Sequence, residues 1–243
     1  MIYGIDSKIL PAMGSRDRHT VGRAAGRGYL CALALLVALA GCSDSDGGDG
    51  STKINGSIHV PVGKPAGAVA TVNGSIHIDD NAAITSATTV NGAVHLGDHA
   101  TATSLNSVNG SIVLGADAHA SGSASSVNGE LELKNGSEVS GALSNVNGQI
   151  TLTAAHVGGG IKTINGSMNI TGASHVEGGI LVEKPSGLQV VHDVPRIVIG
   201  PGATVQGELH FERTVQLYVS DKATIGTVTG ATPISFTGDT PPK

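Results

Sequence analysis

The middle of the chain repeats one short pattern of apolar and polar positions. Seven Asn-Gly dipeptides, each preceded by Val or Ile, recur at spacings of 18, 18, 18, 19, 19 and 18 residues. They are Asn55-Gly56, Asn73-Gly74, Asn91-Gly92, Asn109-Gly110, Asn128-Gly129, Asn147-Gly148 and Asn165-Gly166. A unit of about 18 residues cannot bury a core alone, so each unit must stack on its neighbours. The period therefore predicts a solenoid.

Within each unit, the residues after Asn-Gly alternate between apolar and polar. If the Val or Ile before Asn-Gly is position zero, positions +4 and +6 are apolar in all seven units. These residues are Ile58, Ile76, Val94, Ile112, Leu131, Ile150 and Met168 at +4, and Val60, Ile78, Leu96, Leu114, Leu133, Leu152 and Ile170 at +6. A period of two is typical of a strand with one buried face.

Two further positions extend this pattern to other faces of the unit. Position −3 is apolar and predicts a second short strand, at Val69, Ala87, Leu105, Ala124, Leu143 and Ile161. Position −7 is mostly small or β-branched and indicates a third face, at Ala83, Thr101, Ala120, Val139 and Val157. We therefore expect an all-β fold: a single-stranded parallel β-helix, roughly triangular, with about 18 to 20 residues per coil.

The Asn-Gly pairs predict the corners of this helix. Both residues tolerate left-handed backbone angles, and Asn side chains stacked coil upon coil can form an amide ladder. The alternative is a β-hairpin at each Asn-Gly pair. Hairpins would need a second reverse turn and a mirrored apolar pattern in every unit, whereas the observed pattern is translated. A right-handed winding is favoured, although the residues do not fix the handedness.

The period continues beyond the last Asn-Gly pair. Residues 203–205 and 223–225 share an Ala-Thr-Val/Ile motif at a spacing of 20 residues and predict two more coils, with Ile199 and Val219 at equivalent positions. Residues 183–196 carry two prolines and interrupt the pattern, which predicts a loop insertion. The aromatic residues Phe211, Tyr218 and Phe236 are expected to cap the end of the core.

The first 42 residues indicate export and a membrane anchor. Four arginines precede a short apolar run from Tyr29 to Ala40, which is typical of a secretory signal and too short to span a bilayer. The run ends in Leu39-Ala40-Gly41-Cys42, which resembles the lipobox of bacterial lipoproteins. That resemblance implies that Cys42 is lipidated, and Ser43 after it favours the outer membrane. An ordinary signal peptide containing a cysteine is the alternative.

Charge and cysteine content narrow the class of function. Residues 42–243 carry 9 Lys and Arg against 17 Asp and Glu, a net charge of 9 − 17 = −8, which argues against binding to nucleic acid. Cys31 would leave with the signal, so we expect no disulfide. The predicted organisation is signal peptide 1–41, acidic tether 42–52, repeat β-helix 53–182, loop 183–196, final coils and cap 197–230, and tail 231–243.

A family resemblance agrees with a structural role. The glycine-punctuated segment from Ile197 to Leu209 resembles bactofilin-like polymer-forming proteins and bacterial adhesin-type β-helix domains. The resemblance implies scaffolding, self-association or surface attachment and carries no catalytic residues. We therefore expect no enzyme activity and no cofactor. The expected partners are the membrane, through Cys42, and other copies or envelope proteins.

Position +5 offers one constellation with possible metal chemistry. It holds His59, His77 and His95 in three consecutive units and should point outward between the two buried residues. Strands about 4.8 Å apart could bring these imidazoles near enough to share a divalent metal ion. A solvated face with recently copied repeats is the alternative, and a glycan-binding outer face is another. His99, His119, His156 and His175 recur near the next corner at shifting offsets and give a weaker indication.

Overall fold

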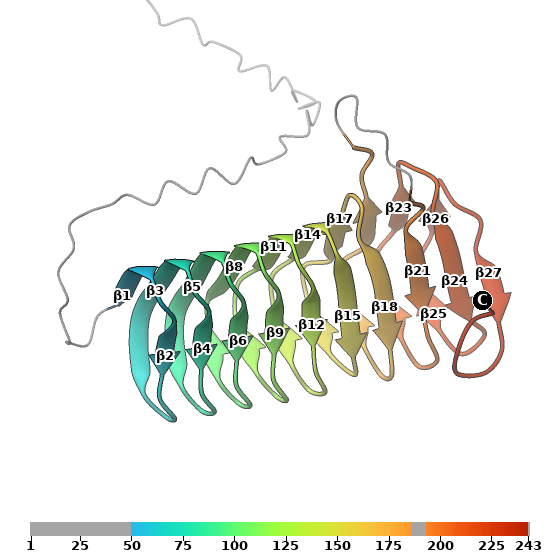
Figure 1. Ribbon diagram of the computed structural model, residues 1–243. Coiled ribbons are helices and arrows are strands. Elements are labelled where there is room, and N and C mark those ends of the chain that lie inside the picture. Colours follow the sequence, from blue (N-terminus) through green and yellow to red (C-terminus); the bar gives the residue numbers. More distant parts are fainter. Residues whose placement is uncertain (1–49, 186–192, 243) are drawn as a thin grey trace, which may run out of the picture. The chain divides into compact units, whose positions relative to one another are not determined.

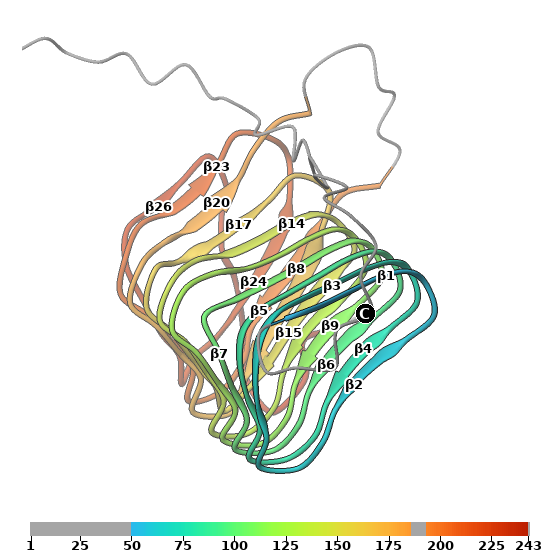
Figure 2. The same ribbon diagram turned by 90° about the vertical axis from the view of Figure 1, so that its left-hand side faces the viewer.

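The described part of the protein is a parallel β-solenoid of about ten turns. The computed structural model describes residues 50–185 and 193–242, which form 27 β-strands. Every pairing between these strands is parallel. Figure 1 shows the turns stacked along one axis, and Figure 2 shows them end on. The predicted fold class is confirmed, and the hairpin alternative is wrong.

Each turn passes through three faces in the same order. The first face is a ten-stranded sheet. Its strands are β2 (Ile58–Val60), β4 (Ile76–Ile78), β6 (Val94–Leu96), β9 (Ile112–Leu114), β12 (Leu131–Leu133), β15 (Gln149–Thr153), β18 (Ser167–Thr171), β21 (Arg196–Ile199), β24 (Gln216–Ser220) and β27 (Ile234–Phe236). Among the described residues, no helix could span a membrane.

The other two faces share one 17-stranded sheet. The second face consists of β7 (Thr101–Ala102), β10 (His119–Ala120), β13 (Glu138–Val139), β16 (His156–Val157), β19 (His175–Val176), β22 (Thr204–Val205) and β25 (Thr224–Ile225). The third consists of β1 (Ser51–Asn55), β3 (Pro65–Asn73), β5 (Ala83–Asn91), β8 (Ser104–Asn109), β11 (Ala124–Asn128), β14 (Leu143–Asn147), β17 (Ile161–Thr163), β20 (Ile180–Val182), β23 (Leu209–Phe211) and β26 (Val228–Thr229). The long strands β3 and β5 also cover the second face in their turns, and β5 pairs with both β7 and β8.

The core is a stack of aliphatic side chains from all three faces. All fourteen side chains at positions +4 and +6 are buried, as are the six at position −3. At position −7 the prediction is wrong for Ala83 and Thr101, which are exposed, because Ile84 and Ala102 are the buried residues there. The reason is that the segment between the second and third faces gains one residue. Ala102 precedes Leu105 by three positions, whereas its partner Ala120 precedes Ala124, the partner of Leu105, by four.

The Asn-Gly corners join the third face to the first through a ladder of side-chain amides. Each Asn after Asn55 donates its Nδ2 hydrogen to the Oδ1 atom of the Asn one coil earlier, at N···O distances of 2.8–3.0 Å. Six such bonds connect the seven asparagines from Asn55 to Asn165. None of these asparagines has a positive φ, so the side chain rather than a left-handed backbone explains why Asn is used here.

The glycine of each pair allows neighbouring coils to approach closely. A Cβ atom added at Gly110 would overlap the carbonyl group of Gly92, and one added at Gly74 would overlap that of Gly56. Inside the corner, a buried polar side chain donates to the same glycine carbonyl in five coils, as Thr89 does to Gly74 at 3.0 Å. These bonds satisfy hydrogen-bond donors that would otherwise be costly to bury.

Left-handed residues form the corner between the first and second faces. Their φ values lie between 48° and 76°. They are Gly63, Asn81, His99, Asp117, Gly136, Ala154, Gly172 and Gly202. Ala154 is the member of this column least suited to it, because an alanine has neither the freedom of glycine nor a polar side chain that can bond locally.

The C-terminal turns differ in detail from the sequence prediction. Strand β27 pairs with β24 and lies inside residues 231–243, the predicted tail. Phe211 and Phe236 are buried at this end, as a cap requires, but Tyr218 points outward and carries the Arg196 guanidinium 4.8 Å above its ring centre.

The boundaries of the N-terminal tether and of the loop insertion also shift slightly. Strand β1 begins at Ser51, within the predicted tether, and β21 begins at Arg196, the last residue of the predicted loop. The predicted signal peptide, Cys42 and the tether up to Asp49 lie outside the described residues, as do residues 186–192 of the loop.

We predict that Ala154→Gly raises the free energy of unfolding by about 0.5 to 1 kcal/mol, because relief of left-handed strain exceeds the added entropy of the unfolded chain. Urea denaturation of the wild type and the variant measures this change. The matched reverse substitution is Gly63→Ala, at a φ of 64° with no atom within 4 Å of the added Cβ. It should destabilise by a similar amount. If Ala154→Gly destabilises the protein, the strain assignment is wrong.

Candidate functional site

The predicted histidine column lies on the outer surface of the first face. His59, His77 and His95 occupy the middle of β2, β4 and β6 and are paired in register. The ring centres of His77 and His95 are 4.8 Å apart and their planes differ by 5°, whereas His59 and His77 are 5.8 Å apart and tilted by 47°. The outward position is therefore as expected, and the rings of His77 and His95 are stacked.

One carboxylate bridges the first two histidines of this column. Asp79 Oδ2 lies 2.8 Å from His59 Nε2, and Asp79 Oδ1 lies 3.2 Å from His77 Nε2. One aspartate thus holds both imidazoles through their Nε2 atoms. Metal binding by His59, His77 and His95 stays a prediction.

The surroundings of His95 favour the neutral form of its imidazole. Partial burial lowers the pKa of His95 below its ordinary value, and the neighbouring His77 and Lys134 lower it further, against the opposing effect of Asp98 and Asp80. The neutral imidazole is therefore favoured in the folded protein. The stacked geometry agrees, because two parallel charged rings would repel each other.

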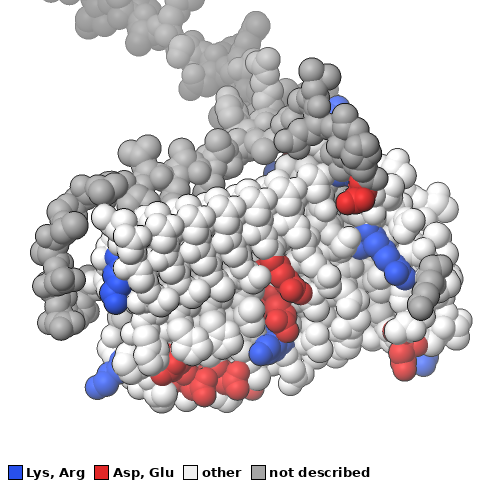
Figure 3. Space-filling model, viewed as in Figure 1, with Lys and Arg blue, Asp and Glu red and all other residues white. Residues whose placement is uncertain are grey.

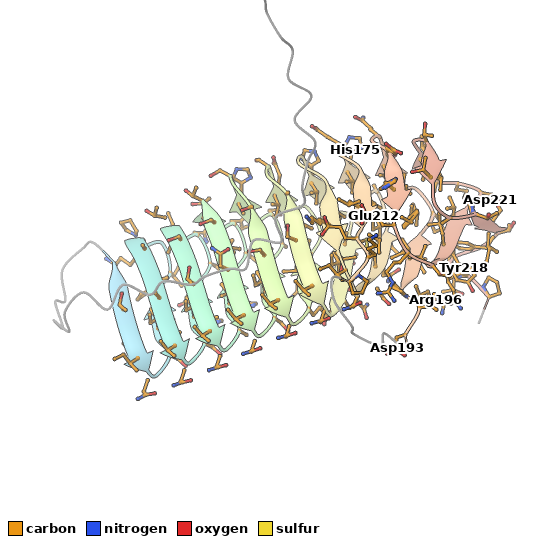
Figure 4. The ribbon with its side chains drawn as sticks, turned by 90° about the horizontal axis from the view of Figure 1, so that it is seen from above. His175, Asp193, Arg196, Glu212, Tyr218 and Asp221 are labelled. Atoms are coloured by element: carbon orange, nitrogen blue, oxygen red, sulfur yellow. The ribbon has the colours of Figure 1, made fainter. Side chains whose placement is uncertain are left out.

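A second column of titratable side chains lies on the second face. His119, Glu138, His156 and His175 occupy β10, β13, β16 and β19 and are paired in register across four consecutive coils. All four lie at the surface, with outward-pointing side chains that are partly exposed. Figure 4 shows His175 on the side of the solenoid away from Arg196 and Tyr218.

The sequence gives only a weak indication of this column, because the offsets of its histidines from the preceding Asn-Gly pairs vary. His119, Glu138 and His156 share position −8, counted back from the Val or Ile of the Asn-Gly corner that follows them. Counting back from each Asn-Gly pair, with glutamate admitted alongside histidine, would have revealed three of the four members. His175 has no following Asn-Gly pair, and only the strand pairing places it.

Short contacts connect the members of the second column with Glu177. His156 Nε2 lies 3.1 Å from Glu177 Oε1, and His156 Nδ1 lies 3.6 Å from Glu138 Oε1. His119 Nδ1 lies 3.5 Å from Glu138 Oε2. Among the described residues, one group of at least three His, Cys, Asp or Glu side chains has ligand atoms all within 4.8 Å of one another, and it consists of His156, His175 and Glu177.

The amide ladder ends at a specific charged partner. The Arg213 guanidinium donates to Asn165 Oδ1, to the carbonyl oxygen of Ile164 at 3.0 Å and to that of Asp193 at 2.8 Å. Asn165 is the last asparagine of the ladder, so its Oδ1 atom has no further asparagine to accept from. Arg213 therefore takes the place of the next rung, a role that sequence reasoning did not assign.

Charged side chains cover only part of the face seen in Figure 1. Figure 3 shows the face seen in Figure 1, where most of the surface is neither acidic nor basic.

Comparison with protein-family models, with curated proteins and with solved structures finds no match to this chain. Function must therefore be argued from the residues themselves.

We predict that the protein loses stability as the pH falls below about 6.5, and that His95→Val removes part of this loss. Because the pKa of His95 is lowered on folding, the unfolded chain binds the proton more tightly, so acid favours unfolding. Val113 already occupies this column in the next coil, so valine should fit. Urea denaturation at pH 7 and pH 5 measures the difference. If the variant loses as much stability between pH 7 and pH 5 as the wild type does, His95 does not contribute to the acid sensitivity.

Proposed function

We propose that the chain is a membrane-anchored lipoprotein whose β-solenoid acts as a rigid, non-catalytic structural rod. The observation that carries this proposal is that the polar residues of the repeat form hydrogen bonds between neighbouring coils. Its recurrent polar side chains at the Asn-Gly corners bond to the equivalent corner of the preceding coil, as the asparagine ladder and Thr89 do. Such a repeat builds length and stiffness, since each coil contacts only its neighbours.

The anchoring part of the proposal depends on the N-terminal sequence. An arginine-containing segment, a short apolar run and the box Leu39-Ala40-Gly41-Cys42 stand in the order that lipid attachment needs. Several acyl chains on one residue give durable attachment, whereas a single chain gives only marginal binding. The acidic, Gly- and Ser-rich residues 43–50 would then separate the rod from the membrane surface. The outer membrane, on its periplasmic or outer side, is the favoured location.

A specific observation favours end-to-end self-association as the structural role. Ile54 is 46% exposed on β1 of the first coil, whereas Ile164, at the same position six coils later, is 6% exposed. The residues at this position in the five coils between them are partly exposed. A further coil stacked on this end would cover part of the Ile54 side chain. Ile234, on the last strand β27, is also 46% exposed. Stacking one copy on another would continue the parallel sheets in a head-to-tail arrangement.

We predict that Cys42→Ser abolishes lipid attachment and releases the protein from the membrane fraction. The cysteine thiol is the group that would be alkylated, and serine cannot replace it. Labelling with a radioactive fatty acid in a bacterium, followed by fractionation, measures both effects. Cys31→Ser is the matched control and should leave label and location unchanged. An unlabelled wild-type protein would contradict the anchoring proposal.

Sedimentation velocity tests self-association. The wild-type protein should form larger species as its concentration rises, and Ile54→Lys with Ile234→Lys should keep it monomeric, because buried charges at the contact are costly. Val194→Lys is the control, since Val194 is similarly exposed at 45% but lies in the loop insertion. A wild-type protein that remains monomeric at every concentration would exclude self-association and leave a solitary rod.

A further inference from the structure

The second column offers a geometry suited to a metal ion. We propose that His156, His175 and Glu177 bind one divalent transition-metal ion, with Zn²⁺ as the reference ion. Two imidazoles and one carboxylate form a donor set that Zn²⁺ accepts, and the fourth position would be filled by water. The inference depends only on the second face of the solenoid and is independent of the proposed anchoring and rod function.

The positions of the ligand atoms are close to those that a tetrahedral ion needs. Bonds of about 2 Å around Zn²⁺ place neighbouring ligand atoms about 3.3 Å apart. His156 Nε2 and Glu177 Oε1 are already 3.1 Å apart, and all three ligand atoms lie within 4.8 Å of one another. The ring centres of His156 and His175 are 5.6 Å apart at a tilt of 32°. Small rotations of partly exposed side chains would close the remaining distances.

The backbone holds the three residues in place before any ion binds. His156 and His175 face each other across the parallel pair of β16 and β19, and Glu177 directly follows β19. The amide of Glu177 donates to the carbonyl oxygen of Val157 at 2.9 Å, which fixes the start of this corner against the preceding coil. The backbone at the site is therefore ordered before the ion binds, so binding costs less conformational entropy.

Glu138 provides a second carboxylate on the far side of His156. Its Oε1 atom faces His156 Nδ1 at 3.6 Å, while Nε2 of the same ring faces Glu177. A carboxylate near the other ring nitrogen of a histidine ligand orients the ring and increases its basicity. Glu138 and Glu177 together also attract a cation. The ion would connect the coil of β16 to the coil of β19 and so stabilise the folded state.

Isothermal titration of the purified protein with Zn²⁺ tests the inference. We compare the wild type with a variant carrying His156→Thr and His175→Thr. Threonine occupies the same column at Thr101, Thr204 and Thr224, so the variant should fold, and its circular dichroism and Tm without metal should match the wild type. The expected result is the loss of one equivalent of bound Zn²⁺ and of the rise in Tm that Zn²⁺ causes in the wild type.

The histidine column of the first face supplies the matched control. A variant with His59→Val, His77→Val and His95→Val should keep the equivalent that the threonine variant loses. A wild-type protein that binds no Zn²⁺, or a threonine variant that binds as the wild type does, overturns the inference. Loss of that equivalent in the valine variant alone would also overturn it and would place the metal on the first face.

Discussion

The structure depends on the close approach of successive coils at the Asn-Gly corners. At these corners the glycine backbones lie so near each other that a Cβ atom at Gly110 would overlap Gly92, and the asparagine side chains bond from coil to coil at 2.8–3.0 Å. The same spacing sets the register of the sheets. It therefore aligns the aliphatic core on the inside and the two columns of titratable side chains on the outside.

A ladder of identical side chains leaves a hydrogen-bond acceptor without a partner at its end, and another residue of this chain bonds to that acceptor. Asn165 would leave an unused acceptor, and the Arg213 guanidinium takes it while also bonding two backbone carbonyls. Beyond this point the turns continue without Asn-Gly, and Phe211 and Phe236 fill the core. The rod thus changes its corner chemistry where the ladder stops, yet the parallel pairing of β18 with β21 carries the sheet across the insertion.

The repeat predicted the fold because each recurring position has the same physical role in every coil. The alternation at +4 and +6 identified buried residues such as Ile76 and Ile78, and the spacing of Asn-Gly identified the corner. The second column was undervalued because coils of 18 and 19 residues alternate there, which shifts His119, His156 and His175 against a fixed period. Arg213 could not be predicted, since it lies 48 residues from Asn165, beyond the loop that interrupts the repeat.

The most direct test of the ladder compares Asn109→Ala with Asn55→Ala by urea denaturation. Asn109 makes two ladder bonds, whereas Asn55, at the end of the ladder, makes one. At about 1 kcal/mol per hydrogen bond, the free energy of unfolding should fall by about 2 kcal/mol for Asn109→Ala and about 1 kcal/mol for Asn55→Ala. Equal effects, or no measurable effect of Asn109→Ala, would contradict the claim that the ladder holds the coils together.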